Sequence, residues 1–265
     1  MVLINGSATT ALTVTDRAIQ YGDGLFTTLA VSRGVPLLWS LHLARLHQGV
    51  ERLRLPAFDD ELLRDEVGLV AAGTDCIVKI ILSRGPGGRG YGTNGSGPLT
   101  RIVTVHPLPA HRQQWRDQGI HMQTLALRMG HQPLLAGLKS LNRLEQVLAR
   151  QEVEERGVDE GLCLDLQQRV VEATAANLWW YAGGHWHTPA LHRCGVAGVM
   201  RALLLERLGP KLTKDARRAT VVEAEEVMVT NAVFGVVPVR QLDERRWQHW
   251  PQTAQLQGQL ASVMI

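Results

Sequence analysis

Apolar positions along the chain fall into two successive groups of runs, which predict two sets of strands and helices. In the first group, β-rich runs at 2–4 and 11–14 flank an Asn5-Gly6 turn and predict an opening hairpin. A helix is predicted from Ser40, a plausible N-cap, to about Leu53, because apolar residues recur there at helical spacing. The other elements predicted in this group are strands at 25–34, 76–84 and 101–108 and a helix at 59–72.

The second group follows a polar, proline-containing stretch at 107–117, which we interpret as a linker. One helix is predicted at 141–156, after Ser140, and another begins after Gly198. Strands are predicted near 120–128, 160–166, 169–172, 177–181, 220–231 and 236–241. The expected fold class is α/β (α+β) in two domains, a smaller N-terminal one at 1–106 and a larger C-terminal one at 118–265, to which Lys139 is assigned.

Composition narrows the class of protein without changing this picture. The chain has 265 residues, of which 45% are hydrophobic and 20% charged, values typical of a globular protein with a substantial core. Three cysteines without a short spacing favour a reducing compartment, and the N-terminus lacks the pattern of a signal peptide. No apolar run approaches the roughly 18 residues of a membrane span. We therefore expect a cytoplasmic protein with no membrane partner.

Charge adds one useful fact, which is a shortage of lysine. The formal net charge is only +3, and the 28 basic residues are four lysines and 24 arginines scattered along the chain. Without a basic run, and with few Tyr and Phe residues for base stacking, no nucleic-acid partner is expected. Any chemistry that needs a lysine amine has four candidates: Lys79, Lys139, Lys211 and Lys214.

One familiar motif lacks the structural context it requires, and several others are absent. Gly85-x-Gly87-x-x-Gly90 matches the dinucleotide fingerprint formally, but more glycines and Pro98 follow it, so the helix that this fingerprint requires cannot begin there. The chain has no phosphate-binding Gly-Lys-Ser/Thr, no HExxH or CxxC metal pattern and no G-x-S-x-G elbow. No metal site is predicted.

A cofactor such as pyridoxal 5′-phosphate (PLP) needs a lysine for covalent attachment, an acid facing its pyridine nitrogen and an anion site for its phosphate. Lys139 joins a short apolar segment to a predicted helix start, where burial would favour the neutral, nucleophilic amine. Lys211 and Lys214 lie in a polar stretch, and Lys79 is expected to point outward by strand alternation. An ordinary lysine with a buried stem and a solvated amine remains the alternative for Lys139.

Candidates for the acid and the anion site also exist. Glu172 ends an apolar strand, where a pyridinium N–H would be a suitable partner, although a strand-end acid facing water fits equally. Gly195 and Gly198 precede an apolar helix whose N-terminal amides favour phosphate, although such glycines often mark only a turn. The turn 230–232 could add donors, and Arg45 a bidentate guanidinium.

These pieces occur in an order that resembles the fold-type IV PLP enzymes, the class-IV aminotransferase family. The resemblance spans Ile4 to about Val239, and Trp179, where the family usually has Phe or Tyr, is a minor departure. The family includes branched-chain and D-amino-acid aminotransferases and the 4-amino-4-deoxychorismate lyases, and its members form homodimers. The blocks that carry the resemblance are YGDGLF (21–26), HLARL (42–46), GLKSLNRLEQ (137–146), EATAANLW (172–179) and GVAGVMR (195–201).

Within the family, the chain is most similar to the lyases. Family aminotransferases usually carry Glu after the aromatic residue of the first block and Gly-Ile-Thr-Arg at the phosphate helix, whereas this chain has Thr27 and Gly198-Val199-Met200-Arg201. The resemblance implies release of 4-aminobenzoate and pyruvate from aminodeoxychorismate in folate biosynthesis. The alternatives are a transaminase of the same fold, acting on D- or branched-chain amino acids, and a binding protein that has lost the chemistry.

The resemblance also implies roles for individual residues. Lys139 would hold the cofactor covalently and then act as acid and base. Thr28 would position the substrate or deliver a proton to the departing pyruvate. Arg89 and Tyr91 are candidates for binding the two substrate carboxylates. The remaining cofactor-binding residues implied are Glu172 at the pyridine nitrogen and Arg45, Val199, Met200, Asn231 and Ala232 at the phosphate.

Overall fold

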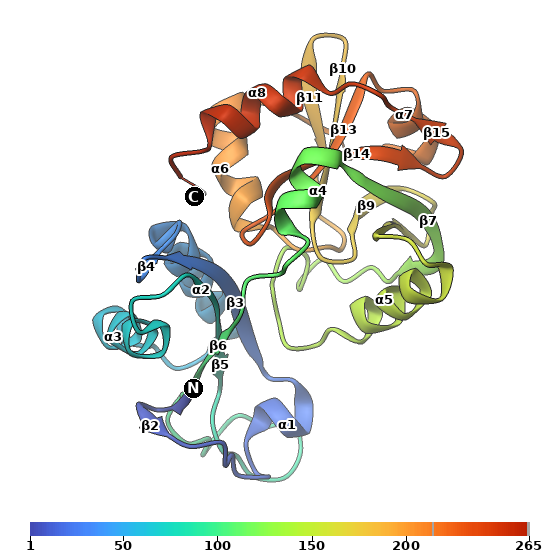
Figure 1. Cartoon of the computed structure of the whole chain (residues 1–265). Helices are drawn as coiled ribbons and strands as arrows, with labels where there is room; N and C mark the ends of the chain where they lie inside the picture. The colour runs from blue at the N-terminus through green and yellow to red at the C-terminus, as the bar shows by residue number, and fades with distance from the viewer. Residues whose placement is uncertain (214, 264–265) are drawn as a thin grey trace. The chain divides into compact units, whose positions relative to one another are not determined.

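The computed structural model describes residues 1–213 and 215–263, which form two compact units (Figure 1). Unit 1 contains Met1–Leu108 and Lys139–Asn142, and unit 2 contains Pro109–Leu138 and Arg143–Ile265. Lys139 therefore groups with unit 1 by its contacts, although it follows 30 residues of unit 2 in the sequence. Lys214 lies outside the described residues.

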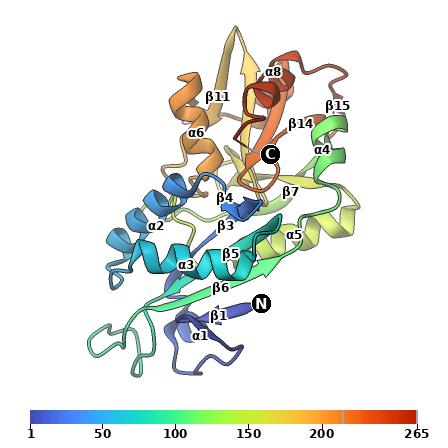
Figure 2. The same ribbon diagram turned by 60° about the vertical axis from the view of Figure 1, so that its left-hand side comes forward.

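Unit 1 is built on an antiparallel sheet, which its described residues form from six strands (Figure 2). In spatial order the strands are β2 (Ser7–Ala8), β1 (Val2–Ile4), β6 (Thr100–His106), β5 (Cys76–Ser83), β3 (Gly24–Ser32) and β4 (Val35–Pro36). The predicted opening hairpin is confirmed, but its second strand lies at 7–8 rather than 11–14 because the chain turns back directly after Asn5-Gly6. No helix follows the glycines of the 85–90 fingerprint, as expected.

Helices α2 (Trp39–Leu53) and α3 (Asp60–Ala71) cover one face of this sheet, and the short α1 (Arg17–Tyr21) precedes β3 (Figure 2). The apolar core of unit 1 lies between the sheet and these two helices. Gly49 allows α2 to approach closely, since a Cβ there would lie 2.4 Å from a methyl group of Leu25. The prediction of Ser40 as N-cap is wrong: the cap is Leu38, in a left-handed conformation and without a capping side chain.

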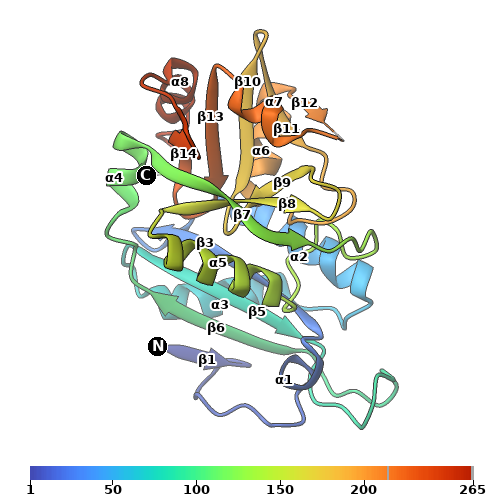
Figure 3. The ribbon, with the colours of Figure 1, turned by 90° about the vertical axis from the view of Figure 1, so that its right-hand side faces the viewer.

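Unit 2 contains a mixed sheet, in which β7 pairs in parallel with both β8 and β14 (Figure 3). The order is β12 (Lys211–Thr213), β11 (His185–Pro189), β10 (Asn177–Ala182), β13 (Glu226–Asn231), β14 (Gly235–Leu242), β7 (Ile120–Met129), β8 (Glu160–Asp165) and β9 (Val170–Ala173), with β15 (Arg245–Arg246) paired to β14. The strand predicted at 220–231 is shorter, because a helix occupies its first part.

The helices of unit 2 pack on this sheet. They are α4 (Arg112–Gln118), α5 (Leu144–Arg156), α6 (Val199–Leu208), α7 (Arg218–Val222) and α8 (Pro251–Gln259). Helix α5 lies against β7 and β8 (Figure 3), and α4 occupies most of the stretch interpreted as a linker. Within the described residues, no helix is both long enough and apolar enough to cross a bilayer.

Candidate active site

In unit 1, the segment Lys139–Asn142 pairs with the beginning of β3. Phe26 N–H donates to the Lys139 carbonyl at 2.9 Å, and Leu141 N–H donates to the Gly24 carbonyl at 3.0 Å. This pairing keeps the lysine in an extended segment, so that α5 begins at Leu144 rather than at the predicted residue 141. The backbone of Lys139 is therefore fixed by a strand and not by a helix.

The amine of Lys139 lies over an aromatic ring. Its Nζ is 4.3 Å from the centroid of the Phe26 ring, and the Nζ of Lys79 is 5.0 Å from the same centroid. An ammonium group at such a distance is attracted to the ring face. Two of the four lysines are thus close to Phe26, and both are half-buried.

A buried polar network lies on the α2 side of β3. Arg45 Nη2 donates to the Thr27 hydroxyl in a short hydrogen bond, and the same hydroxyl lies 2.6 Å from His42 Nδ1. His42 and Thr27 are completely buried. Burial lowers the pKa of His42 well below its usual value, and the positive charges of Arg45 and Lys139 lower it further. The network therefore places an arginine and a neutral histidine in the unit that carries Lys139.

Thr28 lies next to this network in sequence but not in space. Successive residues of a strand point to opposite faces, so Thr28 faces away from Thr27 and shares its face with Phe26. Across the sheet its partner in β5 is Lys79. The structure thus places Thr28 on the face that carries Phe26, and its catalytic role stays a prediction.

Arg89 and Tyr91 lie in the glycine-rich loop between β5 and β6. Buried Arg17 organises this loop by donating to the carbonyls of Gly90 and Tyr91 at 3.2 and 3.3 Å. The ring of Tyr91 contacts that of Tyr21, with centroids 5.4 Å apart, yet Tyr91 remains 86% exposed. Arg89 is exposed as well. The two predicted carboxylate ligands thus sit on a held but exposed loop.

In unit 2, Glu172 is aimed by an irregularity in its strand. The register between β8 and β9 shifts just before Glu172, so that Val171 is the extra residue of a β-bulge, a feature that redirects side chains. Glu172 is buried, and its Oε2 accepts from Val196 N–H at 2.8 Å and from Asn177 Nδ2 at 3.4 Å. These bonds attach Glu172 to the turn that precedes α6.

Arg143 and Arg201 both interact electrostatically with the Glu172 carboxylate. Burial lowers the pKa of Arg143 and of Arg201, and the negative charge of Glu172 opposes that shift in both. Arg201 is 6% exposed and donates to the Pro189 carbonyl at 2.8 Å. Two largely buried guanidinium groups thus interact electrostatically with this carboxylate.

The turn before α6 forms a cradle of backbone amides. Gly195 has φ +88°, and a Cβ at Gly198 would lie only 2.2 Å from Asn177 Oδ1, the atom that accepts from Gly198 N–H at 3.0 Å. No described side chain caps α6, so the first amides of this helix, at Val199 and Met200, point out of its end. Such amides, together with the helix dipole, suit a phosphate group.

The predicted second turn lies beside this cradle in unit 2, because β13, which leads into it, pairs with β10, the strand that begins at Asn177. Asn231 Oδ1 accepts from Val233 and Phe234 N–H at 2.9 and 2.8 Å, so its side chain shapes its own turn. The groups that this turn can offer a ligand are therefore backbone groups, such as the amide of Ala232. The structure brings Glu172, the α6 amides and this turn together within unit 2.

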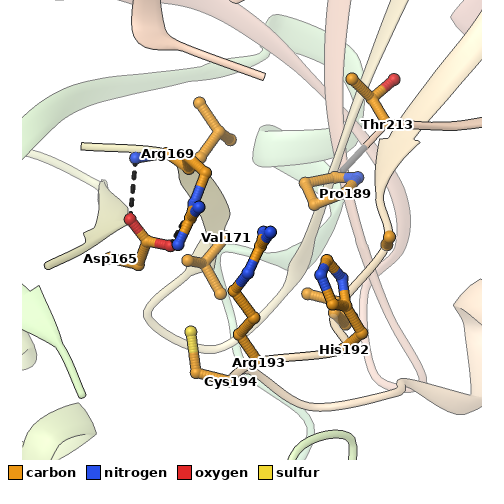
Figure 4. A pocket seen from close by; sticks show the side chains of 11 residues that line it. Asp165, Arg169, Val171, Pro189, His192, Arg193, Cys194 and Thr213 are labelled. Carbon is orange, nitrogen blue, oxygen red and sulfur yellow. Dashed lines mark hydrogen bonds and ion pairs between the residues drawn. The ribbon is translucent and has the colours of Figure 1, made fainter. Parts of the chain in front are cut away.

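A separate pocket of unit 2 lies beside Cys194 (Figure 4). His192 and Arg193 point into it, whereas Arg169 is bound to Asp165, with Nε 2.7 Å from the carboxylate, and to Asp215. Burial would raise the pKa of Asp165, but hydrogen bonds from Arg169 and other groups lower it to about 2. Arg193 is paired as well, with its Nη1 3.2 Å from the Asp215 carboxylate, so both arginines at this pocket are engaged in ion pairs.

Comparison with known proteins assigns the family. The family model described as amino-transferase class IV matches residues 24–242. The chain belongs to the class IV aminotransferase family. Its resemblance to the fold-type IV enzymes is thereby confirmed.

Class IV proteins similar to this chain include lyases and aminotransferases. The chain is 36% identical over 245 residues to aminodeoxychorismate lyase of Vibrio harveyi, covering 90% of both chains. The crystal structure of 4-amino-4-deoxychorismate lyase from Pseudomonas aeruginosa matches with TM-score 0.92 and 45% identity, covering 99% of this chain and 98% of that one. A putative branched-chain-amino-acid aminotransferase of Methanocaldococcus jannaschii is 28% identical over 88% of this chain and 83% of its own length.

Sequence reasoning missed three polar residues that organise the site. Asn177 holds both Glu172 and the α6 turn, and its only signal was its place in the class IV block 172–179. His42 lies one helical turn before Arg45 in the block HLARL, a spacing that puts both on one face of a helix. Thr27, the link between these two, was noted only as a departure from the Glu that family aminotransferases usually carry, which does not indicate a contact with Arg45.

Proposed function

We propose that this class IV protein is a PLP-dependent lyase that converts 4-amino-4-deoxychorismate into 4-aminobenzoate and pyruvate, a step of folate biosynthesis. The observation that carries the proposal is the similarity, over nearly the whole length, to two proteins named for this lyase activity. The aminotransferase relative is less similar. The residues of the candidate site support the same chemistry.

The groups present in each unit fit PLP. Among the described residues, Arg45 Nε in unit 1 is a buried donor without a hydrogen-bond partner, as a phosphate-binding group should be before its ligand arrives. In unit 2, no described side chain caps α6, so the amides of Val199 and Met200 at its start can donate to a phosphate. The Glu172 carboxylate would accept a hydrogen bond from the protonated pyridine nitrogen, and Lys139 would bind the aldehyde carbon covalently.

When bound, PLP supplies an electron sink for the electron pair left by proton removal beside the substrate amine. Lys139 would take that proton, and Thr28 would position the substrate or hand a proton to the departing pyruvate. Arg89 and Tyr91 would bind the substrate carboxylates. Because the product ring is aromatic, the protein mainly has to orient groups and move protons.

One assay separates this function from its alternatives. Purified protein is loaded with PLP and given aminodeoxychorismate, and 4-aminobenzoate and pyruvate are measured without any added keto acid. We expect both products in equal amounts. Turnover that requires 2-oxoglutarate and an amino acid would instead identify a transaminase, and tight binding without turnover would identify a protein that has lost the chemistry.

The lysine assignment has its own test. Borohydride reduction of the loaded protein followed by peptide mapping should place the label on Lys139. Lys79 is the natural internal control, since its amine lies near the same Phe26 ring. A label on Lys79 would overturn the site assignment even if the lyase activity is present.

The acid can be tested separately from the lysine. Glu172→Gln keeps the size of the side chain but removes its charge. We expect the variant to retain bound cofactor and to lose about 10- to 100-fold in kcat, the worth of a charge-assisted hydrogen bond. An unchanged kcat would remove the role proposed for Glu172.

We also propose that the protein acts as a homodimer in a reducing, cytoplasmic compartment. Helix α5 exposes Leu144, Val147 and Leu148 at a spacing that puts them on one face, which is suited to contact with a second copy. All three cysteines are free and buried, which is compatible with reducing conditions. Light scattering coupled to size exclusion should give twice the chain mass.

A further inference from the structure

His42 and Thr27 form a buried pair that has no part in the function proposed above. We propose that His42 is a positioning residue: as a neutral imidazole with its proton on Nε2, it fixes Arg45 through the Thr27 hydroxyl for a phosphate-bearing ligand. The ligand's identity as PLP rests on the proposed function. The arrangement of the three side chains lies entirely within unit 1 and does not depend on it.

Counting protons determines the tautomer. A guanidinium group can only donate, so the Thr27 oxygen accepts the hydrogen bond from Arg45 Nη2. The hydroxyl carries one proton, and in the described part of the chain the group placed to accept it is His42 Nδ1, 2.6 Å away. Nδ1 therefore bears no proton, and the proton of the neutral ring is on Nε2.

The surroundings of His42 keep it neutral. Its side chain is 0% exposed, so burial disfavours the charged form, and the charges of Arg45 and Lys139 add to this effect. Burial also lowers the pKa of Arg45, to about 10, which still leaves Arg45 positively charged at neutral pH. The network thus concentrates its positive charge on Arg45.

Two buried donors of this network point to a ligand. Among the described residues, His42 Nε2 and Arg45 Nε have no hydrogen-bond partner. A buried donor without an acceptor costs about 1–3 kcal/mol, so such groups are rare unless a ligand completes them. Arg45 Nε is the donor that belongs to the cation, and a cationic N–H donor matches the oxygens of a phosphate monoester.

The test compares PLP with pyridoxal, which has the same aldehyde and ring but lacks the phosphate. Dissociation constants of both are measured by absorbance titration of the apoprotein and its variants. His42→Leu and Thr27→Val each break the chain to Arg45, and we expect the PLP constant to rise about 10- to 100-fold while the pyridoxal constant stays within about twofold.

Conservative variants show that the hydrogen bonds matter rather than the volume. His42→Asn keeps an acceptor near the position of Nδ1, and Thr27→Ser keeps the hydroxyl, so both should bind PLP nearly as well as the wild type. His47→Leu is the matched control, because His47 lies on the same helix but is exposed and pairs with Asp60. If His42→Leu fails to fold, the two Thr27 variants carry the comparison.

A spectroscopic measurement addresses the tautomer directly. Nitrogen-15 NMR of the labelled imidazole should find His42 protonated on Nε2 and unprotonated on Nδ1 at neutral pH. A proton on Nδ1 or a charged ring would overturn the proposal. Equal losses for PLP and pyridoxal would overturn it as well, since they would show a purely structural role.

The outcomes also separate this inference from the proposed function. A protein that shows the expected PLP and pyridoxal constants but releases no 4-aminobenzoate would refute the lyase function and leave the inference standing. A protein with full lyase activity, whose PLP constant is the same in His42→Leu and wild type, would refute the inference alone.

Discussion

Each of the two units carries groups suited to an anion, but they build these groups from different parts of the chain. Unit 1 uses a side chain, Arg45, which a threonine and a histidine hold in place. Unit 2 uses backbone amides at the uncapped start of α6, in a turn whose close packing requires glycine at 195 and 198. A site made of side chains can be altered one atom group at a time, whereas a backbone site can be altered only by changing the shape of the chain.

The largest effect is expected from Gly198→Ala in unit 2. The new Cβ would lie 2.2 Å from Asn177 Oδ1, so the hydrogen bond that holds the turn must break. We expect PLP affinity to fall about 100-fold or more and the free energy of unfolding to fall by about 2–4 kcal/mol. Titration with PLP and urea denaturation measure the two quantities.

Gly258→Ala is the control for this change. Gly258 lies in α8, and a Cβ there meets nothing within 4 Å, so the variant should bind normally and gain up to about 1 kcal/mol of stability. Normal PLP binding by Gly198→Ala would show that the α6 amides are not part of the phosphate site.

Arg45→Gln should weaken PLP binding without lowering the free energy of unfolding, whereas Gly198→Ala should lower both. Removing the guanidinium should raise the PLP dissociation constant about 10- to 100-fold, since hydrogen bonds to a charged group are lost. Because a buried charge with an unpartnered Nε is removed as well, we expect the free energy of unfolding to stay equal or to rise. A large loss of stability with unchanged PLP binding would contradict the comparison.

The neutral histidine of unit 1 predicts a pH dependence of stability. The pKa of His42 is lowered in the folded protein, so below about pH 6.5 the unfolded chain binds a proton that the folded chain does not. The free energy of unfolding should therefore be constant above that pH and fall below it, by at most about 1.4 kcal/mol per pH unit. Urea denaturation of wild type and His42→Asn, from about pH 8 to about pH 5, should show this slope only in the wild type.

The smallest effect concerns two matching helix ends. The residue that caps the end of α2 in unit 1 is Arg54, with φ 51°, and the residue that caps the end of α5 in unit 2 is Gly157, with φ 63°. Because left-handed backbone favours glycine, Arg54→Gly should gain about 0.5–1 kcal/mol and Gly157→Ala should lose a similar amount. Thermal unfolding measures both, and equal signs for the two changes would contradict this account.

Much of the fold could be predicted from patterns within short windows of sequence. The spacing of apolar residues located β3, β5 and α3 closely, because each is long and regular. Short elements such as α1 and α7 gave too few residues for a period to be recognised. The strand predicted at 220–231 was too long because α7, which overlaps its first residues, has too few residues to be recognised as a helix.

The candidate site was only partly predictable, because its parts depend on long-range contacts. The cradle before α6 followed from two glycines and a helix, which are local signals. The extended backbone at Lys139 depends on pairing with Gly24 and Phe26, which are far away in sequence, so a helix was expected too early. The bulge at Val171 and the bonds of Asn177 likewise arise only when distant strands meet.

The placement of Lys139–Asn142 in unit 1 has a consequence for how this protein can be divided. The backbone passes from one unit to the other three times, after residues 108, 138 and 142. A fragment that ends at Leu108 lacks the segment that pairs with the start of β3, and a single protease cut leaves the units still joined. A single crossover between two genes therefore cannot exchange one complete unit and leave the other unchanged.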